Sequence, residues 1–211
     1  MLNPMKALLL VDLQNDFYTL GSSAIPGVDE IIPIANQLMQ SGYFDCIVAT
    51  QDWHPATHQS FAANHYFRYP KQRVDINGNS QLLWGMHGIQ DSYGADLIDD
   101  LTLDKIDKIV QKGQNETIES YSSFFDNAQN PASDLADYLR DKAVEQVFIL
   151  GIPLEYSVKY TALDAVKLGF QTFLLEDACR PIHYEEGAFE EALKEMKAQG
   201  ISFLDSDQLI L

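Results

Sequence analysis

The chain has 211 residues, of which 46% are hydrophobic and 21% charged, and its formal net charge at pH 7 is −17. A chain of this length can bury a complete core, so we expect residues 1–211 to form one globular domain. Nucleic acids and anionic membranes are bound through basic patches, so such an acidic chain is expected to bind neither. The two cysteines, Cys46 and Cys179, are too few for a disulfide framework and indicate a reducing, cytoplasmic location. The first apolar run, Ala7–Val11, is too short for a signal peptide or a membrane span.

Short apolar runs alternate with amphipathic segments along the chain. This alternation predicts an α/β fold, a three-layer α/β/α sandwich whose six-stranded, mostly parallel sheet is covered by helices on both faces. The expected strands are Ala7–Val11, Cys46–Thr50, Lys108–Gln111, Gln146–Leu150, Thr172–Leu175 and Ser202–Leu204. The expected helices are Val28–Gln40, Ala132–Asp141, Ser157–Leu168 and Glu185–Gln199.

A long loop at about residues 52–94 interrupts the alternation. From Pro55 to Gly94 the sequence is rich in Asn, Gln, Ser, Gly, Tyr and His, and it follows neither a helical nor a strand period. A loop of this length inside a compact domain is usually functional. In parallel sheets ligands bind beyond the C-terminal ends of the strands, and the candidate functional residues all follow such ends.

Two candidate side chains stand at the ends of the first and third expected strands. Asp12 follows a hydrophobic strand, where partial desolvation raises the pKa of a carboxyl group and suits a general base. A structural role, with Asp12 capping the following turn, is the alternative. Lys112 would pair with Asp12 or orient a substrate, and an ordinary surface lysine is the alternative.

The second expected strand leads into a histidine-rich segment. Asp52 and His54 alternate along extended chain, so both side chains point to one side. His58, His65 and His87 follow in the same loop, and a third ligand would complete a metal site. One carboxylate with two or more imidazoles suits Zn²⁺, Fe²⁺ or Mn²⁺ and leaves positions open for water or substrate. A chance clustering of histidines is the alternative.

The stretch from Gly151 to Ala162 presents one small hydroxyl side chain at a strand-to-helix turn. An apolar strand, Val147–Leu150, runs into a tight turn, and Ser157 lies where the next helix begins. The free N–H groups and the positive end of the helix dipole favour an anion there. The position is one where α/β enzymes place a nucleophile.

Together these motifs resemble, in the same order, those of the nicotinamidase/pyrazinamidase branch of the isochorismatase-like hydrolases. The resemblance covers nearly the whole chain through Val11–Phe17, Gln51–Phe61, Lys112–Asn127, Ser157–Ala165 and Asp177–Arg180. It implies the isochorismatase-like fold. It also implies hydrolysis of nicotinamide, or of pyrazinamide-like carboxamides, to the acid and ammonia through an acyl-enzyme in NAD salvage.

The resemblance further implies a role for each site residue. Asp12 would be the general base, Lys112 its partner, and residue 157 the nucleophile. The side chains walling the ring pocket would be Phe17, Trp84 and Tyr121, and Ile152 and Pro153 would border the substrate. The ligands of one divalent metal ion, with Zn²⁺ expected before Fe²⁺ or Mn²⁺, would be Asp52, His54 and His87. His58 would be a fourth or an outer ligand.

The chain departs from the family pattern at three places. Ser157 stands where the family has cysteine, and a hydroxyl is far harder to ionise than a thiol. Pro153 stands where the family usually has alanine. Proline suits the cis peptide bond that the family has there, but it lacks the N–H that the family uses in its oxyanion hole. Gly85 and Gly88 replace the proline and cysteine of the family's Trp-Pro-x-His-Cys motif.

These departures leave several functions open. The first is slow or altered hydrolysis of a small amide. The second is a catalytically silent homologue that keeps the metal and a heteroaromatic ligand, and the third is hydrolysis of another small substrate. Vinyl-ether hydrolysis of the isochorismatase type needs the aspartate but no thiol, and the nicotinamidase-like metal loop argues against it. The sequence also leaves open whether the chain forms a homo-oligomer.

Overall fold

The computed structural model describes residues 3–76 and 78–209, and its centre is a six-stranded sheet in the order β5-β2-β1-β6-β7-β8. The strands are β1 (Met5–Val11), β2 (Cys46–Asp52), β5 (Lys108–Lys112), β6 (Val144–Gly151), β7 (Gln171–Cys179) and β8 (Ser202–Leu204). Neighbouring strands of this sheet pair in parallel throughout. The predicted α/β fold is confirmed, and the sheet expected to be mostly parallel is parallel at every pairing.

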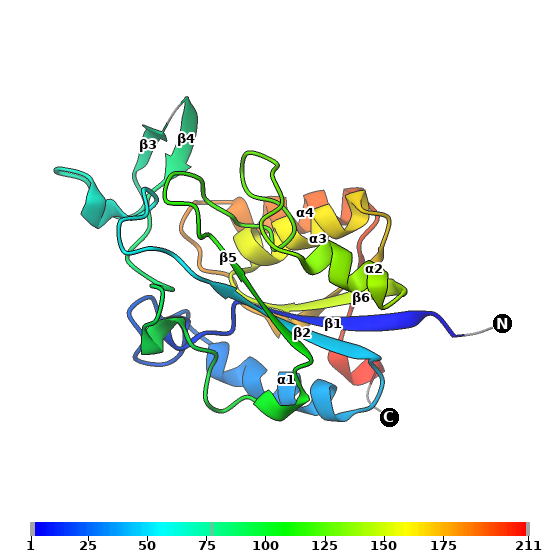
Figure 1. Cartoon of the computed structure of the whole chain (residues 1–211). Coiled ribbons are helices and arrows are strands. Elements are labelled where there is room, and N and C mark those ends of the chain that lie inside the picture. The colour runs from blue at the N-terminus through cyan, green and yellow to red at the C-terminus, as the bar shows by residue number, and fades with distance from the viewer. Residues whose placement is uncertain (1–2, 77, 210–211) are drawn as a thin grey trace.

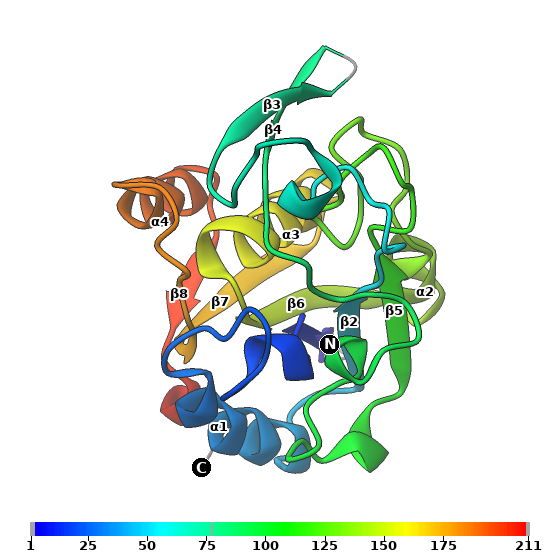
Figure 2. The same cartoon turned by 90° about the vertical axis from the view of Figure 1, so that its left-hand side faces the viewer.

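Helices cover both faces of the sheet, which gives the three layers of the prediction. The helix α1 (Val28–Gln40) lies on one face, and α2 (Leu135–Asp141), α3 (Lys159–Lys167) and α4 (Ala188–Ala198) lie on the other (Figure 1). The view turned by 90° looks from the side of the β3–β4 hairpin and again shows α1 below the sheet and α3 above it (Figure 2). Among residues 3–76 and 78–209, no helix combines the length and the apolar character that crossing a membrane requires.

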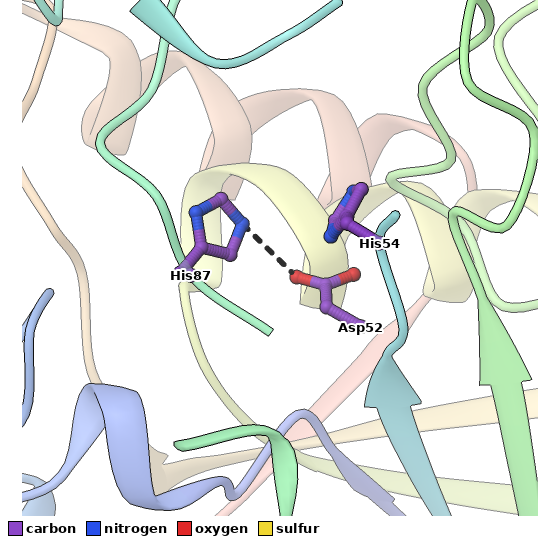
Figure 3. Close-up of side chains that lie close together, drawn as sticks. All are labelled: Asp52, His54 and His87. Atoms are coloured by element: carbon purple, nitrogen blue, oxygen red, sulfur yellow. Dashed lines mark ion pairs between the residues drawn. The ribbon is translucent and has the colours of Figure 1, made fainter. Parts of the chain in front are cut away.

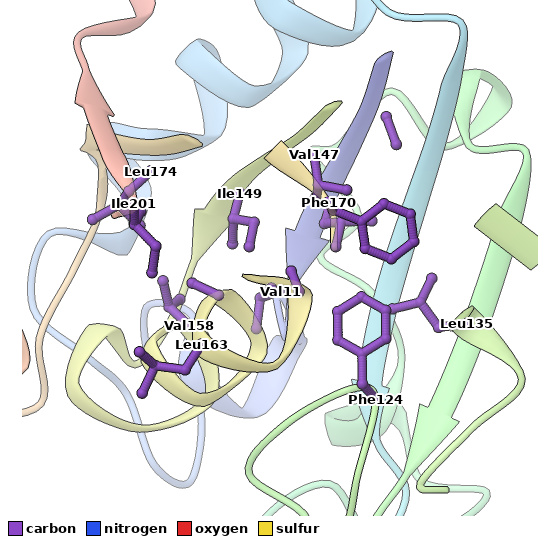
Figure 4. Packing of buried hydrophobic residues seen from close by; sticks show 14 of the residues in the cluster. Val11, Phe124, Leu135, Val147, Ile149, Val158, Leu163, Phe170, Leu174 and Ile201 are labelled. Atoms are coloured by element: carbon purple, nitrogen blue, oxygen red, sulfur yellow. The ribbon is translucent and has the colours of Figure 1, made fainter. Parts of the chain in front are cut away.

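The central strand β1 explains why its sequence is a continuous apolar run. Ala7, Leu9 and Val11 join the core beneath α2, α3 and α4 (Figure 4), whereas Leu8 and Leu10 join the core against α1. Successive side chains of a strand point to opposite faces, so a strand that is covered on both faces needs apolar residues at every position.

Three predicted helices begin two or three residues later in the structure than in the sequence prediction, and one of them is α2, which starts at Leu135 rather than Ala132. The helix α4 starts at Ala188 rather than Glu185, because Gly187 before it has a φ of +75° and lies outside helical backbone. The helix expected from Ser157 is preceded by one wide turn of π-helix, Leu154–Val158, and α3 itself starts at Lys159. The wide turn therefore carries the candidate nucleophile.

The long loop contains a β-hairpin that the sequence did not predict. Its strands are β3 (Arg73–Ile76) and β4 (Asn79–Leu82), which pair antiparallel and project beyond the edge of the main sheet (Figure 1). Strands of four residues carry too few alternations for a strand period to be recognised.

Candidate active site

The C-terminal ends of β1, β2 and β5 bring three ionisable side chains together. Asp12 directly follows β1, while Asp52 and Lys112 end β2 and β5 and lie opposite each other in the sheet register. The Lys112 Nζ lies 2.9 Å from Asp12 Oδ2 and 2.5 Å from Asp52 Oδ1. The three residues are 0%, 6% and 0% exposed in the order Asp12, Asp52 and Lys112. A buried cation between two carboxylates satisfies charges that would each be costly alone.

Burial and mutual attraction drive the pKa values of this group apart. Burial lowers the pKa of Lys112, but the two carboxylates raise it by more, so the side chain stays an ammonium. Burial raises the pKa of Asp12 by more than Lys112 lowers it. Burial also raises the pKa of Asp52, but Lys112 and His87 together hold it well below its usual range. Two carboxyl groups with separated pKa values suit a proton acceptor beside a permanent anion.

The carboxylate of Asp12 is held by the neighbouring strand. Its backbone has a φ of +55°, a left-handed conformation that aspartate tolerates better than most residues. The Asp12 N–H donates to Thr50 Oγ1 at 3.1 Å, and the Thr50 hydroxyl donates to Asp12 Oδ1 at 2.5 Å. The side chain thus contacts Thr50 and Lys112 inside the site rather than capping the following turn.

The turn between β6 and α3 places Ser157 beside this group. Ser157 is 3% exposed, and its Oγ lies 3.5 Å from Lys112 Nζ. The Ile152–Pro153 peptide bond is cis, as the resemblance implied. Proline has no N–H, and the N–H of Leu154 donates to the Arg180 carbonyl at 2.9 Å. Neither residue therefore offers a donor to an oxyanion near Ser157.

A buried cluster beside the turn has the composition of a metal site. Asp52, His54 and His87 each offer a ligand atom, and these atoms lie within 4.8 Å of one another (Figure 3). The His87 Nε2 lies 3.5 Å from Asp52 Oδ2. The Nδ1 of His54 is buried without a hydrogen-bond partner, and a bound cation would satisfy it. One carboxylate and two imidazoles fit Zn²⁺, Fe²⁺ or Mn²⁺.

A second group of three side chains shares His54 with the first. His54, His58 and Glu119 also have ligand atoms within 4.8 Å of one another. His65 belongs to neither group, because its Nε2 donates to the Gln59 carbonyl at 2.7 Å. The structure thus brings four of the five residues considered for the metal to one place and adds Glu119.

An aromatic cavity opens onto these groups. Its wall includes Phe17, Trp84, Tyr121, Pro153 and Ser157. Asp52 and His87 also face it. With a volume of about 20 Å³ it is smaller than the ~150 Å³ cavity that holds a benzene ring in other proteins.

Comparison with known proteins assigns the family. The sequence profile described as the isochorismatase domain matches residues 6–208. The chain belongs to the isochorismatase family. The nicotinamidase of Acinetobacter baylyi is 38% identical over 205 residues, which cover 97% of this chain and 94% of that protein.

Solved structures of this family agree with the sequence match. The nicotinamidase/pyrazinamidase of Acinetobacter baumanii has a TM-score of 0.94 and 38% identity, with 100% of both chains covered. The pyrazinamidase of Pyrococcus horikoshii in complex with zinc has a TM-score of 0.76 and 36% identity, covering 96% of this chain and 99% of that one.

Within this isochorismatase-family fold, the residues nominated from the sequence gather at one edge of the sheet. Ile152 is an exception in part, because it is fully buried and does not line the cavity. Sequence reasoning missed Glu119, Tyr156, Ile182 and Tyr184, which all line it. Glu119 could have been noticed as one of the acidic residues in the segment Lys112–Asn127. The other three lie in the nucleophile turn and in a loop after β7, and no local pattern marks them.

Proposed function

We propose that this chain is a metal-dependent amide hydrolase of the nicotinamidase type, acting in NAD salvage. It would convert nicotinamide, or a pyrazinamide-like carboxamide, to the acid and ammonia. One observation carries this proposal: Ser157, Asp52 and His87 line one cavity with aromatic walls, and Lys112 contacts Ser157 and Asp52 from behind that wall together with Asp12. The similarity to nicotinamidases over nearly the whole chain supports the same activity.

The aromatic walls suit a flat heteroaromatic ring. Trp84 packs edge-on against Tyr156 at 4.8 Å between ring centroids and stacks on Tyr184 at 5.1 Å. Offset and edge-to-face contacts of this kind favour a planar aromatic ligand. Phe17 and Tyr121 complete the walls that would orient its carboxamide toward Ser157.

The metal would be held by Asp52, His54 and His87. When bound, a divalent ion would supply Lewis-acid chemistry next to the substrate. The zinc complex of the Pyrococcus relative supports Zn²⁺ as the first choice, and Fe²⁺ and Mn²⁺ fit the same ligands.

The protein's own residues would move the proton. Asp12 accepts the hydroxyl proton of Ser157 as Oγ attacks the carboxamide carbon, and then returns it to the leaving nitrogen so that ammonia departs. The same carboxylate would take a proton from the water that hydrolyses the acyl-enzyme. The ammonium of Lys112 stays charged throughout, keeping Asp12 in place and stabilising negative charge beside Ser157.

The reacting turn favours a second candidate, a homologue that binds the ligand without hydrolysing it. Serine is a weak nucleophile unless a strong base activates it. Among residues 3–76 and 78–209, His87 of the metal cluster is the one histidine that lines the cavity next to Ser157. Pro153 removes one oxyanion donor, a loss that costs about 100- to 1,000-fold in rate. Binding of nicotinamide without release of ammonia would identify this case.

We also propose a cytoplasmic location. Cys46 and Cys179 are both free and buried. Burial raises the pKa of Cys46 to about 11 and that of Cys179 to about 12, so both stay thiols at neutral pH. Unpaired thiols are typical of reducing compartments.

The test of the proposed function is ammonia release from nicotinamide after chelation and after return of Zn²⁺, Fe²⁺ or Mn²⁺. We expect release only in the metal-loaded protein, and loss of release in Asp12→Asn. Release that persists in Asp12→Asn would contradict the role given to Asp12. If the metal-loaded protein neither releases ammonia nor binds nicotinamide, with binding measured by calorimetry, the whole assignment would be contradicted.

A further inference from the structure

The three buried histidines of the site have neighbours that reveal which ring nitrogen carries the proton. A carboxylate or carbonyl oxygen only accepts hydrogen bonds, so an imidazole nitrogen that is hydrogen-bonded to one carries a proton. A backbone N–H only donates, so an imidazole nitrogen facing one has a free lone pair. Only an unprotonated nitrogen binds a metal ion.

His54 and His87 both present a free nitrogen to the candidate metal site. The Nε2 of His54 lies 2.9 Å from Glu119 Oε1, so the proton is on Nε2 and the unpartnered Nδ1 is free. The Nδ1 of His87 donates to the Gly85 carbonyl oxygen at 2.8 Å, so the proton of the neutral ring is on Nδ1 and Nε2 is free. This Nε2 lies 3.5 Å from Asp52 Oδ2, which is too far for a strong hydrogen bond.

His58 has the opposite arrangement. The backbone N–H of Ser60 donates to His58 Nδ1 at 3.1 Å, so that nitrogen accepts and the proton is on Nε2. Among the described residues, the Nε2 of His58 is buried without a hydrogen-bond partner. His58 as a residue belongs to the group of His54 and Glu119. If His58 bound a metal ion through Nε2, its proton would have to move to Nδ1. That nitrogen could then no longer accept the hydrogen bond from the Ser60 N–H.

The Glu119 carboxylate is itself held in place. It is 5% exposed, and Oε1 also accepts from the N–H of Ser120 at 2.8 Å. A side chain at position 113 would collide with this arrangement, because a Cβ added to Gly113 would lie 2.6 Å from His54 Nε2. The segment that follows Lys112 therefore approaches His54 closely enough for the Glu119 carboxylate to accept a hydrogen bond from it.

We propose that Glu119 is a positioning residue that presents His54 Nδ1 to the metal ion, and that Ser60 excludes His58 from the ligand set. The site then has three protein ligands, Asp52, His54 and His87, with positions left for substrate and water. This inference rests on the metal centre of the proposed function. Carboxylates that bond a ligating imidazole fix its tautomer and ring orientation and raise its basicity.

The first test measures zinc affinity by competition with a chromophoric chelator, which needs no turnover. Glu119→Ala should weaken zinc binding by about 10- to 100-fold, and Glu119→Gln, which keeps an accepting oxygen, should weaken it less. Glu116→Ala, an exposed change in the same loop, is the matched control and should have no effect. His54→Ala should abolish binding. His58→Phe, which keeps a ring beside His54, should leave the affinity within about threefold of the unmodified protein, far from the loss expected for a ligand.

The second test needs no variant and reads the ring nitrogens directly by long-range ¹⁵N–¹H correlation spectra. Without metal we expect protons on Nε2 of His54 and His58 and on Nδ1 of His87. Added zinc should shift the ¹⁵N signals of His54 Nδ1 and His87 Nε2. Both ¹⁵N signals of His58 should stay unchanged, with the proton still on Nε2. A zinc-induced shift of His58 Nε2, or unchanged affinity in Glu119→Ala, would overturn the inference while keeping the metal centre. Failure of the unmodified protein to bind zinc, iron or manganese would overturn both.

Discussion

Lys112 is the residue on which the proposed chemistry depends, because it contacts both halves of the site. Its ammonium lies between Asp12, the proposed base, and Asp52, a proposed metal ligand, and it reaches Ser157 Oγ at 3.5 Å. It also donates to the Ser120 carbonyl at 3.1 Å. One buried cation thus fixes the base, the metal ligand and the nucleophile relative to one another.

Lys112→Met should change the pH dependence of ammonia release. Asp12 must be ionised to act as a base, and burial raises its pKa above 3.8, so activity should fall at low pH with a midpoint above that value. Lys112 opposes this increase, so its removal should move the midpoint to higher pH and lower the maximum rate. Profiles of kcat/KM against pH measure this, with the exposed Lys105→Met as control. A midpoint that stays the same or moves down would contradict the pairing.

Ser157→Cys should produce a thiol that is more reactive than either native cysteine. The Lys112 ammonium and the start of α3 both favour a thiolate at position 157, which lowers the pKa of the thiol. Cys46 and Cys179 are internal references, because burial raises their pKa values to about 11 and about 12. Alkylation by iodoacetamide, located by peptide mass spectrometry, should reach position 157 first, and ammonia release should rise. Equal or slower alkylation there would show that the turn does not activate a nucleophile.

At the scale of elements, the loop after β7 closes the cavity through contacts with the nucleophile turn. Glu155, which is 2% exposed, accepts from the N–H of Ile182 at 3.0 Å and from that of His183 at 2.7 Å. Glu185 bonds Arg73 of the hairpin and the hydroxyl of Tyr156. The cavity walls contributed by Ile182 and Tyr184 are therefore held from two sides.

Glu155→Ala should destabilise the fold and loosen this wall together. Two buried N–H groups would lose their acceptor, at about 1–3 kcal/mol for each group left unsatisfied. Urea unfolding should show the lower stability, and the KM for nicotinamide should rise because the wall is no longer held. Glu155→Gln keeps an accepting oxygen, so its stability and its KM should lie between those of the unmodified protein and of Glu155→Ala. The exposed change Glu186→Ala is the control and should alter neither. A stable Glu155→Ala protein with unchanged KM would contradict this account of the loop.

The same contrast between elements and loops explains what the sequence could predict. Continuous apolar runs identify strands buried on both faces, and parallel strands end at one edge, so the meeting of Asp12, Asp52 and Lys112 followed from the fold class. Glu119 contacts His54 across 65 positions of sequence, and the two belong to different loops. No period or spacing encodes such a contact, nor the hairpin of β3 and β4, whose strands are too short to show a pattern. The residues bordering the site were therefore harder to predict than its centre.

At the scale of the whole molecule, stability should depend on the ionisation of the buried carboxylates. Burial raises the pKa of Glu119, but His54 lowers it by more, so its pKa lies well below 4.5 in the folded chain, and that of Asp52 lies below 3.8. A group whose pKa is lowered by folding contributes stability that is fully present above its ordinary pKa. This contribution is lost as the pH falls below that value and through the pKa of the group in the folded chain. The raised pKa of Asp12 acts in the opposite direction.

The free energy of unfolding of the metal-free protein should therefore fall as the pH is lowered from about 5 to about 3. Urea unfolding at several pH values measures this slope. Glu119→Gln should reduce the slope, because it removes one group with a lowered pKa, and Glu116→Gln in the same loop should leave it unchanged. Equal slopes in all three proteins would mean that Glu119 is not an ionised, buried partner of His54.

The most direct test of the central claim compares ammonia release from nicotinamide by the metal-loaded protein and by its Pro153→Ala/Ser157→Cys double variant. We expect metal-dependent release by the unmodified chain and faster release by the variant, which gains a thiol and an oxyanion donor worth about 100- to 1,000-fold in rate. Release by the variant alone would mean that the site binds nicotinamide but that this chain does not hydrolyse it. No release by either protein, with metal bound and the fold intact, would contradict the nicotinamidase assignment.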